Sequence, residues 1–410
     1  MATRQEQSGE RRRILVCTPF PPRLDARHGG KAPAQLLARL AARNEVGILC
    51  LRSDAEEPVD PEIRERCAYV EEVAIGPAAN GWRQRVRWSL GLLEGLPPWA
   101  VNCRTPAYAE RLRRVVADRR PDVVEFHLQV MAQYASVLDD SDIPRVLVDY
   151  DPGSAWAADL VRTSSGLRRL ARRAELTAWR RYERATRPRF QSIVVFADRD
   201  VEPVSRTARG VPVARIPLAI EVPKEALDPV GAAPPTVLFV GGFGHPPNVD
   251  AARWLAGSIF PRVRRQVPEA ELELVGHAPG DDVLRLQGEG VAVHGSVADV
   301  TPFLDRAAVV VAPIRIGGSM RMKVLEALAA GKALVATPRA AEGIEAVPGT
   351  HYLLADSEDE VVEKLVGLLL DGERRRELAT SARAWAVQKL SWDESVASFE
   401  RLYDSLQATA

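Results

Sequence analysis

Short apolar runs alternate with helical patterns along most of this chain, and that alternation limits the folds open to it. A run at 11–20 leads through a Pro/Gly loop into a helical pattern at 32–44, and another run follows at 45–52. Strand, loop, helix and strand in this order form a βαβ unit, which covers a parallel sheet with helices. Later strand-like runs of this half lie at 122–129, 145–151 and 191–197. The first half therefore predicts one doubly wound domain.

The same alternation restarts after a segment rich in Pro and Ala at 221–235, which is typical of a linker. A helical pattern occupies 248–267 in this second half. Its strand-like runs lie at 236–244, 270–277, 291–297, 307–314 and 333–338. The second half therefore predicts another Rossmann-like domain.

These patterns predict an α/β protein with two Rossmann-like domains. We expect a disordered tail at 1–13, an N-terminal Rossmann-like domain at 14–220, a linker at 221–235 and a C-terminal Rossmann-like domain at 236–389. The amphipathic helix at 390–410 needs an apolar surface to cover, and we expect it to cross back to the N-terminal domain. Open parallel sheets bind ligands at the carboxyl ends of their strands, so both binding edges should face a cleft between the domains.

Composition excludes several classes of function. The chain contains 55 Lys and Arg residues and 55 Asp and Glu residues. Its net charge therefore gives no overall electrostatic attraction to nucleic acid, and any basic site must be local. The polar N-terminus is followed by an apolar run too short for a signal peptide or a membrane span. Four cysteines lie far apart without a C-x-x-C pair: Cys17, Cys50, Cys67 and Cys103. We therefore expect a cytoplasmic protein without disulfides or structural zinc.

The segment 317–338, GGSMRMKVLEALAAGKALVATP, concentrates charge at a junction between a loop and a helix. The backbone N–H groups of Gly318 and Ser319 can hold a phosphate, because a helix N-terminus carries roughly half a positive charge. Arg321 and Lys323 add full charges in the same region. The segment therefore predicts a site for an anionic ligand.

Glu326 follows in the same helix, and a carboxylate is a good acceptor for the two hydroxyls of a ribose. The cations and this carboxylate together fit a nucleoside diphosphate. The alternative is an ordinary amphipathic helix with a glycine C-cap at Gly331 and solvated cations.

The segment 317–338 resembles the donor-binding segment of glycosyltransferase family 4 enzymes, which have the GT-B fold. The resemblance extends over most of 236–400, through VLFVGGFGHPPNVDAARWL, VAVHGSVADVTPFLDRAAVVVAPI and the closing SWDES. It implies that Glu326 holds the donor ribose. The other implied donor contacts come from backbone or loop positions: Gly241, Gly242, Gly295, Val297, Gly318 and Ser319.

The chain departs from the family pattern at two places. Many relatives carry a Glu eight positions before the ribose Glu, where this chain has Gly318. The usual basic pair after the first strand of the donor domain is also missing, since GGFGHPPNVDA contains no Arg or Lys. Arg321 and Lys323 are the cations expected to replace it.

In the first half, TPFPPRLDARHGGKAPAQLLARLA resembles the family's N-terminal glycine loop. The resemblance implies that Gly29 and Gly30 approach the donor phosphates, with charge from Lys31. PDVVEFHLQV resembles the strand that ends in a His of the donor pocket, which is His127 here. A His in that place can hydrogen-bond the sugar or share a proton. The alternative is a structural histidine whose nitrogens are satisfied within the fold.

The sequence LVDYDPGSAW contains a D-x-D pair, Asp149 and Asp151. In single-domain sugar transferases such a pair holds a divalent metal, whereas GT-B enzymes work without one because helix dipoles and cations neutralise the diphosphate. We expect no metal and place Asp151 on the acceptor side as a catalytic candidate.

The segment Arg162 to Arg189 is strongly basic and has an apolar stripe. It fits either peripheral contact with anionic lipid or a packed helix with a solvated basic face. The segment GWRQRVRWSLGLLEGLPPW near Trp82 raises the same question and could line an apolar acceptor pocket.

These features together predict a glycosyltransferase that moves a sugar from a nucleotide diphosphate sugar to an acceptor hydroxyl, with retention and without metal. The nucleotide sugar is a co-substrate, and no other cofactor is expected. The acceptor is open and includes lipid-linked saccharides, polysaccharides and natural products. A nucleotide-sugar epimerase of the same fold and a non-catalytic nucleotide-sugar-binding partner protein are the alternatives.

Overall fold

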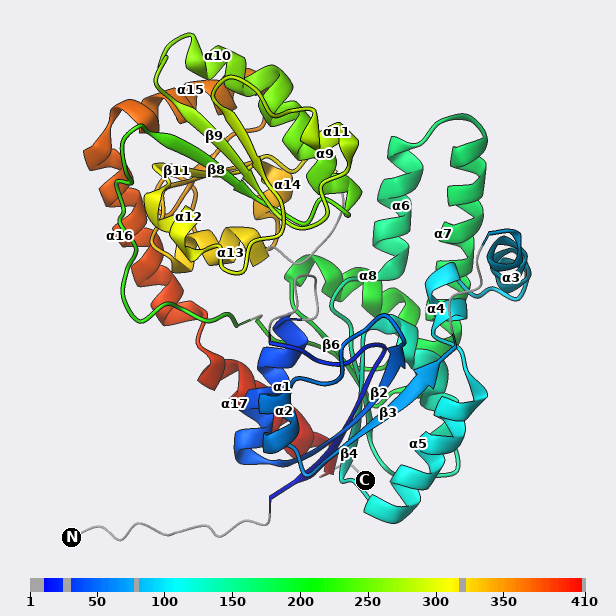
Figure 1. Cartoon of the computed structure of the whole chain (residues 1–410). Helices are drawn as coiled ribbons and strands as arrows, with labels where there is room; N and C mark the ends of the chain where they lie inside the picture. The colour runs from blue at the N-terminus through cyan, green and yellow to red at the C-terminus, as the bar shows by residue number, and fades with distance from the viewer. Residues whose placement is uncertain (1–10, 25–30, 77–80, 218, 317–321, 408–410) are drawn as a thin grey trace, which may run out of the picture. The chain divides into compact units, whose positions relative to one another are not determined.

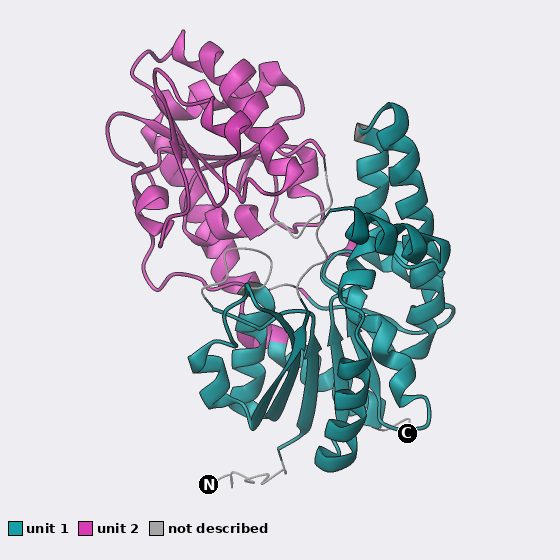
Figure 2. Cartoon of the chain, turned by 45° about the vertical axis from the view of Figure 1, so that its right-hand side comes forward, with its two compact units in different colours: residues 1–196, 200–216, 396–410 teal, residues 197–199, 217–395 magenta. Residues whose placement is uncertain are grey.

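The computed structural model describes residues 11–24, 31–76, 81–217, 219–316 and 322–407. The chain divides into two compact units (Figure 2). Unit 1 contains residues 1–196, 200–216 and 396–410, and unit 2 contains residues 197–199 and 217–395. These units follow contacts within the chain, and the domain boundaries expected from the sequence stay a prediction.

Unit 1 contains a sheet of seven strands in the order β3-β2-β1-β4-β5-β6-β7, and every neighbouring pair is parallel. The strands are β1 Arg13–Thr18, β2 Glu45–Ser53, β3 Tyr69–Ile75, β4 Val123–His127, β5 Arg145–Val148, β6 Ser192–Val195 and β7 Val213–Arg215. The helices of this unit are α1 Lys31–Arg43, α2 Pro61–Arg66, α3 Trp82–Leu93, α4 Pro98–Asn102, α5 Pro106–Arg119, α6 Gly153–Thr163, α7 Gly166–Thr186 and α8 Asp198–Ala208. The short 3₁₀ segments η1 Gln129–Leu138 and η2 Arg187–Arg189 complete it (Figure 1).

Unit 2 contains a sheet of six strands in the order β10-β9-β8-β11-β12-β13, again parallel throughout. The strands are β8 Thr236–Val240, β9 Glu271–Val275, β10 Val291–His294, β11 Val309–Ala312, β12 Leu334–Ala336 and β13 Leu353–Leu354. Its helices are α9 Pro246–Trp254, the π-helical turn η3 Leu255–Ile259, α10 Phe260–Arg264, α11 Asp281–Leu284, α12 Thr301–Arg306, α13 Met322–Ala329, α14 Pro338–Ala341, α15 Glu358–Leu370 and α16 Gly372–Lys389. The prediction of an α/β protein with two parallel sheets is confirmed.

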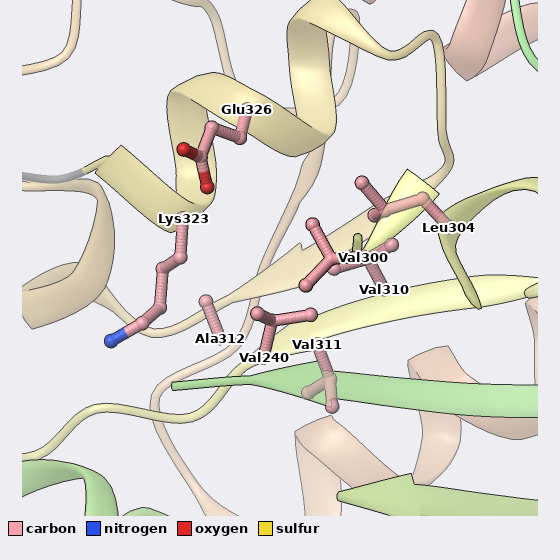
Figure 3. Close-up of a pocket in the computed structure, with 8 residues that line it drawn as sticks. All are labelled: Val240, Val300, Leu304, Val310, Val311, Ala312, Lys323 and Glu326. Carbon is pink, nitrogen blue, oxygen red and sulfur yellow. The ribbon is translucent and has the colours of Figure 1, made fainter. Parts of the chain in front are cut away.

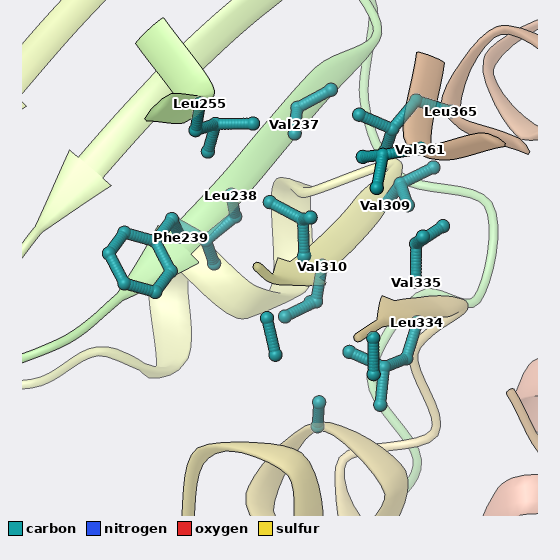
Figure 4. Close-up of a cluster of buried hydrophobic side chains, with 14 of the residues drawn as sticks. Val237, Leu238, Phe239, Leu255, Val309, Val310, Leu334, Val335, Val361 and Leu365 are labelled. Atoms are coloured by element: carbon teal, nitrogen blue, oxygen red, sulfur yellow. The ribbon is translucent and has the colours of Figure 1, made fainter. Parts of the chain in front are cut away.

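The core of unit 2 lies between the sheet and the helices that cover it (Figure 4). Strand residues such as Val237, Val309 and Val335 are fully buried, because both faces of a parallel sheet are covered. Leu255 of η3 and Leu365 of α15 pack in the same cluster. This core holds the carboxyl ends of β8 and β11 in fixed positions next to each other.

The last helix, α17 Trp392–Gln407, leaves α16 and from Val396 onward belongs to unit 1. Phe399 and Tyr403 are its most deeply buried side chains. The Arg12 guanidinium donates to Asp404 at 2.5 Å, and Asn44 donates to Glu400 at 3.4 Å. The expected return of the C-terminal helix to the N-terminal unit is therefore present.

Candidate functional site

Both sheets reverse their strand order at one point, and the sites expected from the sequence lie at those points. In unit 2 the reversal falls between β8 and β11. In unit 1 it falls between β1 and β4, and His127 is the last residue of β4. Ligands of open α/β sheets bind at such switch points, at the carboxyl ends of the strands.

A pocket lies at the switch point of unit 2 (Figure 3). Apolar side chains of the strands and of α12 form one side of it, and Lys323 and Glu326 contribute the charged groups. The lining residues are Val240, Val300, Leu304, Val310, Val311, Ala312, Lys323 and Glu326. Lys323 and Glu326 are three residues apart on α13, so they share one face of the helix. The structure therefore brings the predicted cation and ribose acceptor into one pocket.

Lys323 is held in place by a contact that the sequence did not suggest. Its Nζ donates to Oδ1 of Asn248 at 2.7 Å, and Nδ2 of Asn248 donates to the carbonyl of Gly242 at 2.8 Å. The same ammonium lies 5.7 Å from the centre of the Phe239 ring. Asn248 thus connects the cation of α13 to the glycine loop after β8, which preorganises positive charge beside that backbone.

His245 lies beside this cluster at the start of α9. Burial lowers its pKa, and the charge of Lys323 lowers the pKa further. The lowered pKa favours the neutral imidazole, so the positive charge of this cluster comes from Lys323.

The glycines after β8 and β9 permit a close approach of two loops. A Cβ added at Gly276 would lie 1.8 Å from the carbonyl oxygen of Gly241, and one at Gly241 would lie 2.9 Å from the Asn248 side chain. At Gly242 an added Cβ would meet nothing within 4 Å, so the space beside its backbone is open to a ligand. Gly276 was not singled out from the sequence, although a glycine directly after a strand is a signal of such an approach.

Gly295 and Val297 lie in the loop after β10, at the same carboxyl edge of the sheet as Gly241. Nδ1 of His277 and Oγ of Ser296 are 2.7 Å apart, which links the loops after β9 and β10. Gly318, Ser319 and Arg321, together with Gly29 and Gly30, lie outside the described residues. Their expected contacts with a donor therefore remain predictions.

His127 lies in a buried chain of hydrogen bonds within unit 1. Its Nε2 is 2.9 Å from Oε2 of Glu125, and its Nδ1 is 3.1 Å from the hydroxyl of Tyr150. The Tyr403 hydroxyl of α17 donates to Oε1 of Glu125 at 2.5 Å. A carboxylate oxygen of Glu125 can accept from Nε2 of His127, and the Tyr150 hydroxyl can donate to Nδ1. Burial raises the pKa of both tyrosines well above its usual range.

This chain of bonds bears on the role of His127. The side chain is 0% exposed, and both ring nitrogens are occupied by protein partners. That arrangement is typical of a structural histidine. A hydrogen bond from His127 to a sugar would require the exchange of one partner, and Tyr150 is the partner without a charge.

The two aspartates of the D-x-D pair have different surroundings. Asp149 is buried, and its Oδ2 accepts from Arg187 at 2.8 Å, so its charge is already paired. Arg187 also pairs with Glu183 at 3.3 Å, and burial raises the pKa of Glu183. Asp151 is half-buried between β5 and α6. Within the described ranges, no group of three or more His, Cys, Asp or Glu residues has an arrangement that could hold a metal ion.

Residues 234–371 match the family model described as glycosyl transferases group 1. These residues form a group 1 glycosyltransferase domain. The match covers the strand and glycine loop of β8, the loop after β10, and α13 with Lys323 and Glu326. The matched residues are the part of the chain that the sequence singled out as resembling the donor-binding region of a glycosyltransferase.

Several solved structures are similar to nearly the whole chain. Sucrose-phosphate synthase from Thermosynechococcus elongatus is 16% identical with a TM-score of 0.71, over 98% of this chain and 100% of that chain. WaaG, a glycosyltransferase involved in lipopolysaccharide biosynthesis, is 14% identical with a TM-score of 0.65, over 96% and 99%. Anabaena HepE in complex with UDP is 14% identical with a TM-score of 0.62, over 96% and 100%. At these identities the likeness establishes the GT-B fold. No curated protein matches this chain in sequence.

Proposed function

We propose that this glycosyltransferase transfers a hexosyl group from a UDP-sugar to an acceptor hydroxyl, with retention at the anomeric carbon and without metal. The observation that carries the proposal is the bridge from Lys323 through Asn248 to the glycine loop, beside Glu326, at the switch point of the group 1 domain. A preorganised cation and backbone N–H groups at the carboxyl edge of the sheet can stabilise the negative charge that develops on a departing diphosphate.

Each donor group has a proposed partner in unit 2. Glu326 accepts hydrogen bonds from the ribose hydroxyls, and Lys323 with the Gly242 backbone meets the diphosphate. The loop of Gly295 and Val297 holds the base. Further donor contacts are proposed for residues outside the described ranges: Gly29, Gly30, Gly318, Ser319 and Arg321.

The choice of UDP rests on relatives of the same fold. HepE has been crystallised with UDP, and with UDP and glucose. In the transfer step the acceptor oxygen bonds to the anomeric carbon, and the bond from that carbon to the phosphate oxygen breaks. The acceptor proton passes to the departing diphosphate. His127 would hydrogen-bond the sugar after exchange of Tyr150, and Asp151 would lie on the acceptor side.

No helix in the described part of the chain is long and apolar enough to cross a bilayer. We propose that the enzyme works in the cytoplasm, in polysaccharide, glycolipid or natural-product glycosylation. The epimerase alternative predicts a new sugar from donor alone, and the binding-protein alternative predicts nucleotide binding without turnover.

The test is calorimetric titration with UDP, GDP and dTDP, without metal and then with Mg²⁺, on the wild type and on Glu326→Gln. We expect metal-independent binding of UDP that weakens about tenfold or more in the variant, which loses the charge-assisted acceptor of the ribose. Release of UDP and free sugar from UDP-sugars is measured in parallel. Absence of binding to all three nucleotides would overturn the proposal, and equal binding by Glu326→Gln would remove the ribose assignment.

A further inference from the structure

Many of the exposed large apolar side chains belong to neighbouring helices of unit 1. More than half of the large apolar side chains that are exposed in the described residues belong to α3, α4 and α7. Six of them form what we call the α3–α7 surface: Trp82, Val86, Leu90, Leu93, Leu167 and Leu170. Leu93 is 81% exposed and Leu167 is 84% exposed, whereas most large apolar side chains of this chain are in its cores. So much exposed apolar area marks a candidate interaction surface.

Helix α3 presents its exposed apolar residues as a continuous stripe. Trp82, Val86, Leu90 and Leu93 are spaced by four, four and three residues, so they lie one above another on the same face. The other face is packed, since Gln84 and Trp88 both donate to Oδ1 of Asn102, at 2.5 and 2.9 Å. The fold therefore holds α3 with its apolar stripe turned toward solvent.

Helix α7 behaves differently in its two halves. Trp179 and Tyr182 of the second half are buried in the core of unit 1, which fits the packed-helix alternative for that half. In the first turns of α7, Leu167 and Leu170 are exposed to solvent and do not pack in the core of unit 1. α3 and α7 contact each other, and α3 lies beside the lower part of α7, whereas the first turns of α7 lie at the tip of the α6–α7 hairpin (Figure 1).

The charges beside these apolar residues are mostly positive; the exception at the end of α3 is Glu94, which pairs with Arg104 at 3.2 Å. Arg83, Arg85 and Arg87 are exposed on α3, and the sequence of α3 contains no Asp or Glu. In α7 the first eight residues contain Arg168, Arg169, Arg172 and Arg173 and no carboxylate, although Arg172 pairs with Glu175 at 2.7 Å. An apolar stripe flanked by arginines is the composition of helices that lie in the interface of an anionic bilayer.

We propose that the α3–α7 surface binds the headgroup region of an anionic lipid bilayer. The apolar side chains enter the acyl boundary, and the arginines contact lipid phosphates. The charge pattern favours an anionic lipid surface, because basic side chains near a membrane are attracted to the negative surface potential of its anionic lipids. The binding itself does not depend on the donor site. Its consequence, that the acceptor is lipid-linked, rests on the proposed function.

The test is co-sedimentation of the full chain with vesicles of phosphatidylcholine, and with vesicles that also contain phosphatidylglycerol. We expect binding to the anionic vesicles that weakens in high salt. Trp82→Ser with Leu93→Ser should weaken it by about tenfold or more. The matched control is Leu370→Ser with Val387→Ser, two exposed apolar residues of unit 2, which should bind as the wild type does.

A second pair of variants tests the charges. Arg168→Gln with Arg169→Gln should weaken binding by about fivefold for each arginine, whereas Arg113→Gln with Arg265→Gln, exposed arginines elsewhere, should not. Equal binding to both kinds of vesicle, or equal losses in test and control variants, would overturn the proposal. Self-association that the Trp82 and Leu93 changes abolish would instead assign the surface to a second copy. The affinity of the same variants for UDP should be unchanged. UDP titration therefore distinguishes a loss of vesicle binding from damage to the donor site.

Discussion

Replacing Lys323 by Met should lower the rate of sugar transfer by about 10²- to 10³-fold. The ammonium is held 2.7 Å from Oδ1 of Asn248, so its position is fixed before the donor arrives. Against a phosphate charge about 4 Å away, at an effective dielectric near 20, the attraction is about 4 kcal/mol before desolvation is subtracted. The expected loss of rate corresponds to about 3 to 4 kcal/mol of that attraction.

Asn248 provides a sharper form of the same test. Asn248→Ala removes the acceptor that holds Lys323, which should cost about 1 kcal/mol and slow transfer by about fivefold. Because Asn248 acts mainly through Lys323, the double variant should be nearly as fast as Lys323→Met alone. A double-mutant cycle measures this coupling directly.

The assay is the initial rate of UDP release at low and at saturating donor, which separates kcat from kcat/KM. Thermal unfolding of each variant checks that the fold is intact. A Lys323→Met enzyme within twofold of the wild-type rate would refute the assignment of the cation. Fully additive losses in the cycle would refute the role of Asn248 as its support.

Three further predictions concern stability. Tyr403→Phe should destabilise the fold by about 1–3 kcal/mol in urea unfolding, because Glu125 loses a buried donor; an unchanged midpoint would contradict the bond. Gly276→Ala should destabilise by about 1–3 kcal/mol, since its Cβ would clash with the Gly241 carbonyl oxygen, and equal thermal stability would argue against that approach. Burial lowers the pKa of Lys332 to about 8. Between about pH 8 and about pH 10.5, Lys332 is protonated in the unfolded chain but not in the folded one. The free energy of unfolding of the wild type, relative to that of Lys332→Met, should therefore rise by up to about 3 kcal/mol over this range. A difference independent of pH would refute that shift.

The strand β3 was not expected from the sequence, and its composition explains why. β3 has Glu71 and Glu72 in its centre, so its apolar pattern is weak. β3 lies at the edge of the sheet. There Arg111 of α5 pairs with Glu71, and Arg64 of α2 pairs with Glu72. Strands with charged centres are stabilised by partners distant in sequence, which a local pattern does not record.

The polar residues around His127 were missed for a similar reason. Glu125 stands alone in the buried strand VVEFH, and a lone carboxylate in an apolar run is a signal that a partner must exist. The sequence contains no indication that the partner is Tyr403, which lies 278 residues further along the chain. Asn248 is likewise 75 residues from Lys323.

The sequence by itself determined the two parallel sheets, the return of the last helix, and the likeness of the segment of Lys323 and Glu326 to group 1 glycosyltransferases. Those features depend on local periodicity and on loops at strand ends, which neighbouring residues specify. Only the tertiary structure decided that Asp149 is committed to Arg187, that Asn248 holds Lys323, and that the apolar stripe of α3 is exposed while the second half of α7 is buried. Burial and pairing of a side chain depend on which distant segments pack against it, and that is set when the whole chain folds.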